Sequence, residues 1–121
     1  MAARTDRLVV LDEKRITVRE RAATHVVAWS DVMYVRAARN GACLMTESCE
    51  LKVRESIDRI VAKLGPLGMV RIHRGTAVNG ARIRRLVGRS GHRLTLVLNE
   101  RLEFDVGRRF QRTVRLRFGA R

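Results

Sequence analysis

The chain has 121 residues, 45% of them hydrophobic, and a formal net charge of +14 at pH 7. This length suits one domain whose core needs no disulfide or metal, and the hydrophobic content excludes a disordered tail. The sequence has no apolar run near the roughly 20 residues that a membrane span needs, and its first residues lack the apolar stretch of a signal peptide. We therefore expect a cytoplasmic protein without a membrane partner.

Short stretches of alternating apolar and polar residues, separated by turn signals, predict a mainly β fold. In the first half, the expected strands cover residues 8–11, 15–19, 25–28, 32–38, 42–46 and 49–53. Arg39-Asn40-Gly41 is a turn signal, because Asn and Gly adopt positive φ readily. Glu47-Ser48 should join the last two of these strands into a hairpin.

Residues 54–64 are the one clearly helical stretch of the first half. A single apolar stripe at helical spacing is formed by Ile57, Ile60, Val61 and Leu64. Gly65-Pro66 should end the helix, with Gly65 in the left-handed conformation and Pro66 unable to continue it. Further strands are expected at residues 69–72 and 81–87.

The C-terminal segments predict a hairpin followed by a helix. Residues 93–98 and 101–106 alternate cleanly. Leu98 should oppose Leu102, which requires the three-residue connection Asn99-Glu100-Arg101. After Gly107 the apolar residues lie four apart, which predicts an amphipathic helix with a basic face. A strand at residues 115–118 is the alternative.

The positive charge is concentrated in the second half of the chain. Residues 1–70 carry 12 basic and 9 acidic side chains, whereas residues 71–121 carry 14 basic and 3 acidic ones. Lysine occurs only at positions 14, 52 and 63, so most of the cations are arginines. A guanidinium can bind a phosphate or a guanine edge through two hydrogen bonds at once. This clustering favours a nucleic acid as partner, and an anionic membrane surface comes second.

The cysteine and histidine pattern predicts no metal site. Cys43 and Cys49 lie six residues apart, without a C-x-x-C motif, and no zinc-ligand spacing joins them to His25, His73 or His92. We interpret both cysteines as buried small hydrophobic residues, with a redox switch as the alternative. The carboxylates are scattered and no nucleophile–base set is evident, so we expect neither an enzyme nor a cofactor.

Two short basic motifs stand out. Residues 71–79 read Arg-Ile-His-Arg-Gly-Thr-Ala-Val-Asn, and residues 106–110 read Val-Gly-Arg-Arg-Phe. Each lies next to a predicted strand or helix, so we interpret both as loops held out from a β scaffold that present Arg and His to a polyanion. The combination indicates a DNA-binding module.

On these motifs, with Asp31-Val-Met-Tyr34 and the helix at 54–64 in the expected order, the chain resembles the LytTR family. This family supplies the DNA-binding output domain of many bacterial response regulators. The resemblance covers about residues 15–118, with residues 1–14 as a lead-in and first strand and 119–121 as a tail. It implies an elongated, mainly β fold of short antiparallel sheets with one short central helix and a C-terminal helix. The family motifs have Ser where this chain has Gly75 and Gly107.

The resemblance also implies which residues face DNA, from loops that enter successive major grooves. The base-reading candidates are Arg39, Asn40, Arg74, Arg108 and Arg109, with Ala42 beside the first loop. The phosphate-contacting or positioning candidates are Arg71, His73, Asn79, Arg84, Arg85 and Arg112. For His73 a backbone hydrogen bond that shapes the loop is the alternative, for Asn79 a turn-forming role, and for the arginines ordinary solvated charges.

We therefore expect a bacterial transcription regulator that binds double-stranded DNA sequence-specifically, using Arg for both base readout and phosphate contacts. The alternative is a basic β module that binds RNA or a protein partner. Family members commonly occupy repeated half-sites, which implies a homodimer on DNA. Only about fifteen residues precede the resemblance. The chain is thus either a stand-alone regulator, with a separate sensor or regulatory partner, or a piece of a longer protein.

Overall fold

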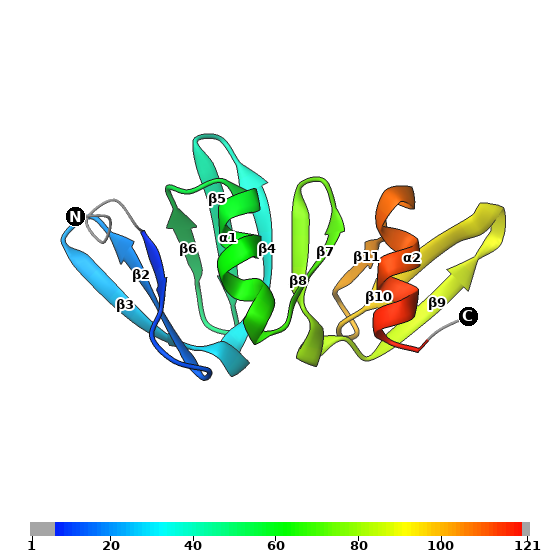
Figure 1. Ribbon diagram of the computed structural model, residues 1–121, viewed down its shortest axis with the longest axis horizontal. Coiled ribbons are helices and arrows are strands. Elements are labelled where there is room, and N and C mark those ends of the chain that lie inside the picture. Colours follow the sequence, from blue (N-terminus) through cyan, green and yellow to red (C-terminus); the bar gives the residue numbers. More distant parts are fainter. Residues whose placement is uncertain (1–6, 120–121) are drawn as a thin grey trace.

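The computed structural model describes residues 7–119, which form three antiparallel sheets in an elongated row (Figure 1). Residues 1–6 and 120–121, the outer parts of the expected lead-in and tail, lie outside the described residues. The N-terminal sheet contains β1 (Leu8–Val10), β2 (Arg15–Glu20) and β3 (Ala23–Ala28) in that order. The mainly β prediction is confirmed.

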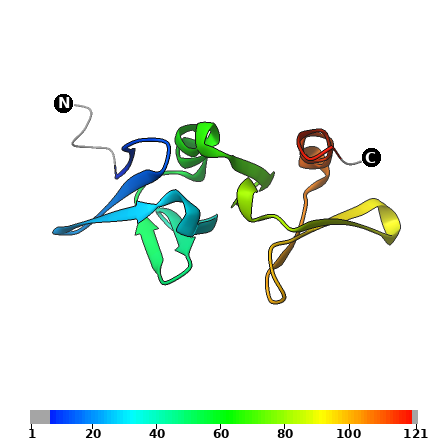
Figure 2. The ribbon, with the colours of Figure 1, turned by 90° about the horizontal axis from the view of Figure 1, so that it is seen from below.

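The middle sheet has five strands and the C-terminal sheet three. The middle sheet has the order β6-β5-β4-β8-β7, from β4 (Val32–Ala38), β5 (Gly41–Thr46), β6 (Glu50–Val53), β7 (Met69–His73) and β8 (Thr76–Asn79). The C-terminal sheet has the order β11-β10-β9, from β9 (Arg85–Arg89), β10 (Arg93–Val97) and β11 (Glu103–Asp105). The two α-helices, α1 (Ile57–Leu64) and α2 (Arg108–Arg117), lie on the same side of the row (Figure 2). Neither they nor any other helix among the described residues is long and apolar enough to cross a membrane.

The central basic motif is a hairpin rather than a loop. Residues 71–79 span the end of β7, the turn residues Arg74-Gly75, and β8, which pairs with both β7 and β4. The expected strand at 81–87 begins only at Arg85, because Gly80–Arg82 forms a short 3-10 helix. The Asn79 side chain caps that helix by accepting a hydrogen bond from the Ala81 N–H (3.1 Å).

Helix α1 begins later than predicted and ends at Leu64 as predicted, but the residue after it has a different conformation. It starts at Ile57 because the Ser56 hydroxyl caps it, accepting from the Arg59 N–H (3.2 Å). Gly65 is right-handed (φ −52°, ψ −47°), so the predicted left-handed conformation is wrong there. The chain continues as a 3-10 helix with Pro66 in its first turn, where a missing N–H costs nothing. The left-handed residue is Gly68 (φ 115°).

The predictions for the C-terminal segments are confirmed. The Leu98 N–H donates to the Leu102 carbonyl (2.9 Å), as the three-residue connection requires. The Asn99 carboxamide oxygen holds that turn by accepting from the N–H groups of Arg101 (2.8 Å) and Leu102 (3.0 Å). Helix α2 continues to Arg117, so the alternative of a strand at its end is wrong.

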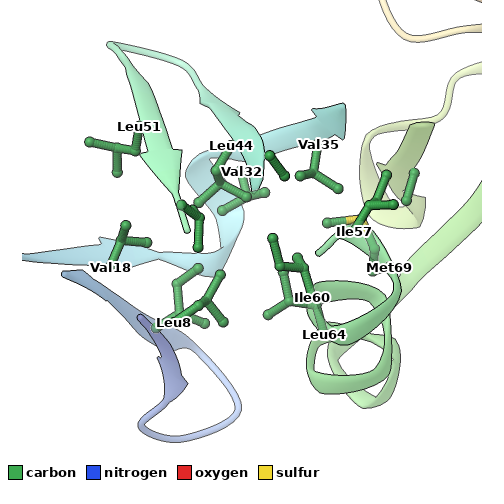
Figure 3. Close-up of a cluster of buried hydrophobic side chains, with 14 of the residues drawn as sticks. Leu8, Val18, Val32, Val35, Leu44, Leu51, Ile57, Ile60, Leu64 and Met69 are labelled. Carbon is green, nitrogen blue, oxygen red and sulfur yellow. The ribbon is translucent and has the colours of Figure 1, made fainter. Parts of the chain in front are cut away.

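The hydrophobic interior is divided into two clusters. In the first, Ile57, Ile60 and Leu64 of α1 point towards the middle sheet, and Leu8 and Val18 approach from the N-terminal sheet (Figure 3). The second joins β7 and β8 to the C-terminal sheet and α2; its fully buried side chains include Ile72, Val78, Leu96 and Val114. Tyr34 of β4 connects the middle and C-terminal sheets through an edge-on contact with Phe104, with ring centroids 4.9 Å apart.

The two cysteines lie in different environments. Cys43 is buried, and burial raises the pKa of its thiol, whereas Cys49 is exposed at the turn before β6. The interpretation of both as buried residues is therefore wrong for Cys49. Both are free thiols.

A buried carboxylate connects the N-terminal sheet to α1. Glu55, whose side chain is 3% exposed, accepts hydrogen bonds from the Leu8 N–H (2.9 Å) and the Lys63 ammonium (2.7 Å). Lys63 also donates to the Leu8 carbonyl (2.8 Å). Glu55 therefore satisfies buried donors on two elements at once.

We expect Glu55→Ala to lower the free energy of unfolding by about 3 kcal/mol, because it leaves the Leu8 N–H and the Lys63 ammonium without their buried acceptor. Urea denaturation measures this loss. Glu103→Ala is the matched control, since the Glu103 carboxylate is exposed and lies 3.7 Å from Arg89; it should cost less than about 1 kcal/mol. Equal losses in the two variants would contradict the role assigned to Glu55.

Candidate nucleic-acid interface

Three segments that carry candidate residues meet at one edge of the molecule, the upper edge in Figure 1. They are the β4–β5 turn, the β7–β8 turn and the start of α2. Backbone hydrogen bonds join them: the Ala37 N–H donates to the Gly75 carbonyl, and the Gly107 N–H donates to the Ile72 carbonyl (both 2.8 Å). The relative positions of the three segments are therefore set by the main chain.

The β4–β5 turn exposes Arg39 and Asn40. Asn40 has a positive φ (61°), as the turn signal predicted. Gly41 (φ 151°) cannot be replaced without distortion, because a Cβ would lie 2.1 Å from the Val53 carbonyl oxygen. Ala42 is fully buried and faces the core. The suggested contribution of Ala42 to DNA contacts is therefore wrong.

Arg71 holds the β7–β8 turn from inside. Its guanidinium donates to the His73 carbonyl (2.8 Å), to the Arg74 carbonyl and to the Asp58 carboxylate (2.8 Å). All three contacts are within the protein, and the side chain is only 21% exposed. These contacts favour the positioning role among the two that the sequence left open.

His73 shapes the same turn. Its Nδ1 accepts a hydrogen bond from the Gly75 N–H (3.2 Å), which is the alternative considered for this residue. A neutral imidazole that accepts at Nδ1 carries its proton on Nε2, so Nε2 remains a donor. His73 is exposed, which leaves that donor available to a ligand.

Helix α2 begins beside this turn. Gly107 is its N-cap residue and supplies no side-chain acceptor. A groove of about 740 Å³ lies between the two segments, with Phe110 and Gly75 in its wall and the side chains of Arg74, His73 and Arg109 around it. The two basic motifs, which start 35 positions apart at residues 71 and 106, thus form one surface.

The exposed arginines of this edge form no ion pairs within the part of the chain that the structure describes. Among residues 7–119, no ion pair involves Arg39, Arg74, Arg108, Arg109 or Arg112. Arg93, by contrast, pairs with Asp105 (3.1 Å). Hydrogen bonds from the Thr95 hydroxyl and the Arg93 guanidinium lower the pKa of Asp105 below its ordinary value, so that carboxylate stays charged. The unpaired arginines leave the edge strongly positive.

Three other candidates lie away from this edge. Asn79 is 1% exposed, and its amide donates to the Trp29 (3.1 Å) and Val32 (2.9 Å) carbonyls. It is therefore a structural residue, out of reach of a phosphate. Arg84 comes directly before β9, and Arg85 is the first residue of that strand. Both lie opposite Val97, at the end of the C-terminal sheet that is far from the start of α2. Figure 1 shows this end of β9 at the lower edge, opposite the edge at which the three segments meet.

A β scaffold that presents exposed arginines from neighbouring turns along one edge has the basic surface typical of nucleic-acid-binding modules. The family model of the LytTr DNA-binding domain matches residues 22–119, and the chain belongs to this family. It is accordingly a DNA-binding domain of transcription regulation, as the two motifs predicted. No curated protein sequence matches the chain.

A solved structure shows the same fold. The chain is similar to a LytTr DNA-binding domain from Bacillus cereus, with a TM-score of 0.75, 19% sequence identity, and coverage of 88% of this chain and 97% of that chain. The expected elongated arrangement is thereby confirmed. The family model starts at residue 22, although β1 and β2 pair with β3 in one sheet.

We expect Arg71→Lys to loosen the β7–β8 turn, because an ammonium cannot reach two carbonyls and a carboxylate in the forked geometry of a guanidinium. The free energy of unfolding should fall by about 1–2 kcal/mol, and amide hydrogen exchange at residues 73–76 should accelerate. Arg108→Lys is the control, with a change within about 0.5 kcal/mol. Unchanged exchange in Arg71→Lys would contradict the positioning role.

We expect Gly107→Ser to be more stable than Gly107→Ala by about 1 kcal/mol, because only Ser supplies the side-chain acceptor for the start of α2. A Cβ at this position fits, since its nearest neighbour, Cδ2 of Phe110, would lie 3.4 Å away. Both substitutions add the same Cβ, so their difference in urea denaturation reports the cap alone. Equal stabilities of the two variants would show that the backbone N–H groups at the start of α2 do not depend on a side-chain acceptor at position 107.

Proposed function

We propose that this domain binds a specific sequence of double-stranded DNA by laying its upper edge along the duplex. The β4–β5 turn enters one major groove, and the start of α2, with the β7–β8 turn beside it, enters the next. The observation that carries the proposal is the alignment of the three segments through the Ala37–Gly75 and Gly107–Ile72 hydrogen bonds. Such an alignment lets separate turns contact one duplex without rearrangement.

Arg74 and Arg109 are the leading candidates for base readout. Both are exposed, both line the groove between the central turn and α2, and neither has an ion pair within residues 7–119. A bidentate Arg–guanine contact contributes about 1–3 kcal/mol of discrimination. Arg39 and Asn40 offer the same chemistry at the β4–β5 turn, where an Asn side chain suits adenine. Arg108 is the remaining candidate for base readout.

Phosphate contacts supply most of the affinity and make it depend on salt. Arg112 is our candidate for such a contact, because it is exposed one helical turn after Arg108. It replaces Arg84 and Arg85, which lie at the opposite edge. The homodimer on repeated half-sites and the separate sensor partner remain expectations from the family.

The alternative of RNA binding has weaker support, because most of the aromatic side chains pack in the interior and Phe118 is the one exposed among the described residues. RNA-binding β modules use exposed aromatic side chains for their bases. Here Trp29 is 8% exposed, and Tyr34 and Phe104 pack against each other. Selection from random duplexes, followed by competition with single-stranded DNA and RNA, tests the choice directly. Recovery of no preferred sequence, or stronger competition by RNA, would reject the proposal.

We expect Arg109→Ala to flatten the preference at one base position of the selected sequence, because it removes a base contact. Arg112→Ala should instead weaken binding to all duplexes about equally and lower the slope of log affinity against log salt by about 0.9, the value for one phosphate. Arg84→Ala removes the same charge at the opposite edge and should change neither. If Arg109→Ala and Arg112→Ala changed DNA binding in the same way, the division into base-reading and phosphate-contacting arginines would be contradicted.

A further inference from the structure

A second group of cations surrounds a pocket at the N-terminal end of the row. The pocket has a volume of about 520 Å³ and is lined by Arg7, Arg19, Glu20, Arg21, Lys52 and Arg54. Three segments bring these residues together. The Arg19 N–H donates to the Arg7 carbonyl (2.7 Å), and β2 lies against β6.

Most of the cations in this cluster lack an ion pair within the described part of the chain. No ion pair within residues 7–119 involves Arg7, Arg21, Lys52 or Arg54. The one carboxylate in the lining, Glu20, lies 3.4 Å from the His25 ring nitrogen. Several like charges around one hollow raise the local potential and attract an anion. The pocket therefore suits a ligand that carries phosphate.

The pocket continues the DNA-facing edge. Arg54 follows β6, whose last residue pairs with Ala42 just after the β4–β5 turn. Its Cα would lie 3.2 Å from a Cβ built on Gly41, so Arg54 touches the turn that exposes Arg39 and Asn40. In Figure 1 the β2–β3 turn lies further out at the same end of the row. A duplex that contacts Arg39 thus has this pocket directly beyond it.

We propose that the pocket binds backbone phosphates of the duplex that flanks the recognised sequence, on the side of the β4–β5 turn. This inference rests on the proposed function, because it assumes a duplex along the upper edge. It adds a contact region outside the family match, since Arg7, Arg19 and Arg21 precede residue 22. Cations from three segments suit successive phosphates of a strand better than one small anion. The pocket thereby lengthens the footprint without reading bases.

The test uses the full chain and a variant with two charges removed, Arg21→Asn with Lys52→Gln. Asn suits position 21 because the residue there has a positive φ (53°). The control, Arg84→Gln with Arg85→Gln, removes the same charge at the opposite edge. Two duplexes carry the selected sequence, one alone and one with about 10 base pairs, roughly one helical turn, of unrelated sequence on each side. Affinity is measured as a function of salt.

For the wild type and the control, we expect a steeper salt slope on the flanked duplex than on the short one. In the pocket variant the slope on the flanked duplex should fall by about 1.8, the value for two phosphates at 0.9 each, while the short duplex is bound as by the wild type. Equal slopes of the wild type on both duplexes would overturn the proposal. The proposal would also be overturned if the salt slope of the pocket variant fell equally on both duplexes.

Two further measurements distinguish this proposal from the binding of a small anion and from the proposed function itself. If ATP raises the melting temperature of the wild type but not of the pocket variant, and the slopes do not differ between duplexes, the pocket binds a small anion and the proposal is wrong. Discrimination between the selected and a scrambled short duplex tests the proposed function separately. That discrimination should survive in the pocket variant even where the flanking contact is lost.

Discussion

The arrangement of the whole domain depends on one constraint, the burial of the β7–β8 hairpin on both of its faces. Met69 and Ala77 pack in the first hydrophobic cluster, while Val70, Ile72 and Val78 pack in the second. Because neighbouring side chains belong to different clusters, a shift of one residue in either strand would exchange the two sets and disrupt both. The register of the hairpin, and with it the position of the Arg74-Gly75 turn, is therefore strongly fixed.

The β7–β8 hairpin also positions the segments on either side of it. The β4–β5 turn is joined to it through Ala37 and Gly75, and α2 through Gly107 and Ile72. In the proposed binding mode, the turns that contact DNA cannot rely on the internal rigidity of a recognition helix. Main-chain hydrogen bonds to a hairpin with two buried faces supply that rigidity here, and the Arg71 guanidinium holds the exposed turn at its tip.

Much of the architecture could be predicted from the sequence because its signals are local. Clean alternation gave the hairpin at 93–106, and an apolar stripe gave α1. Strand β8 was missed because a strand this short, with a buried polar residue at its end, has no alternation to detect. Asn79 was considered for the surface because nothing local shows that its amide serves the Trp29 and Val32 carbonyls, which lie 50 and 47 residues away in the chain. Contacts over such distances depend on the tertiary fold.

The positions of the charged residues in the candidate site were hard to predict for the same reason. Arginines are abundant in the second half of the chain, but composition does not say at which end of a strand each one lies. Arg84 and Arg85 fall at one end of the C-terminal sheet, and α2 starts at the other. Arg71 and Arg82 are used inside the protein, where Arg82 donates to the Ser30 carbonyl (2.6 Å). The direction of each strand, rather than the net charge, therefore decides at which edge each arginine lies. The two motifs meet at one edge because each contains a strand or helix end on that side.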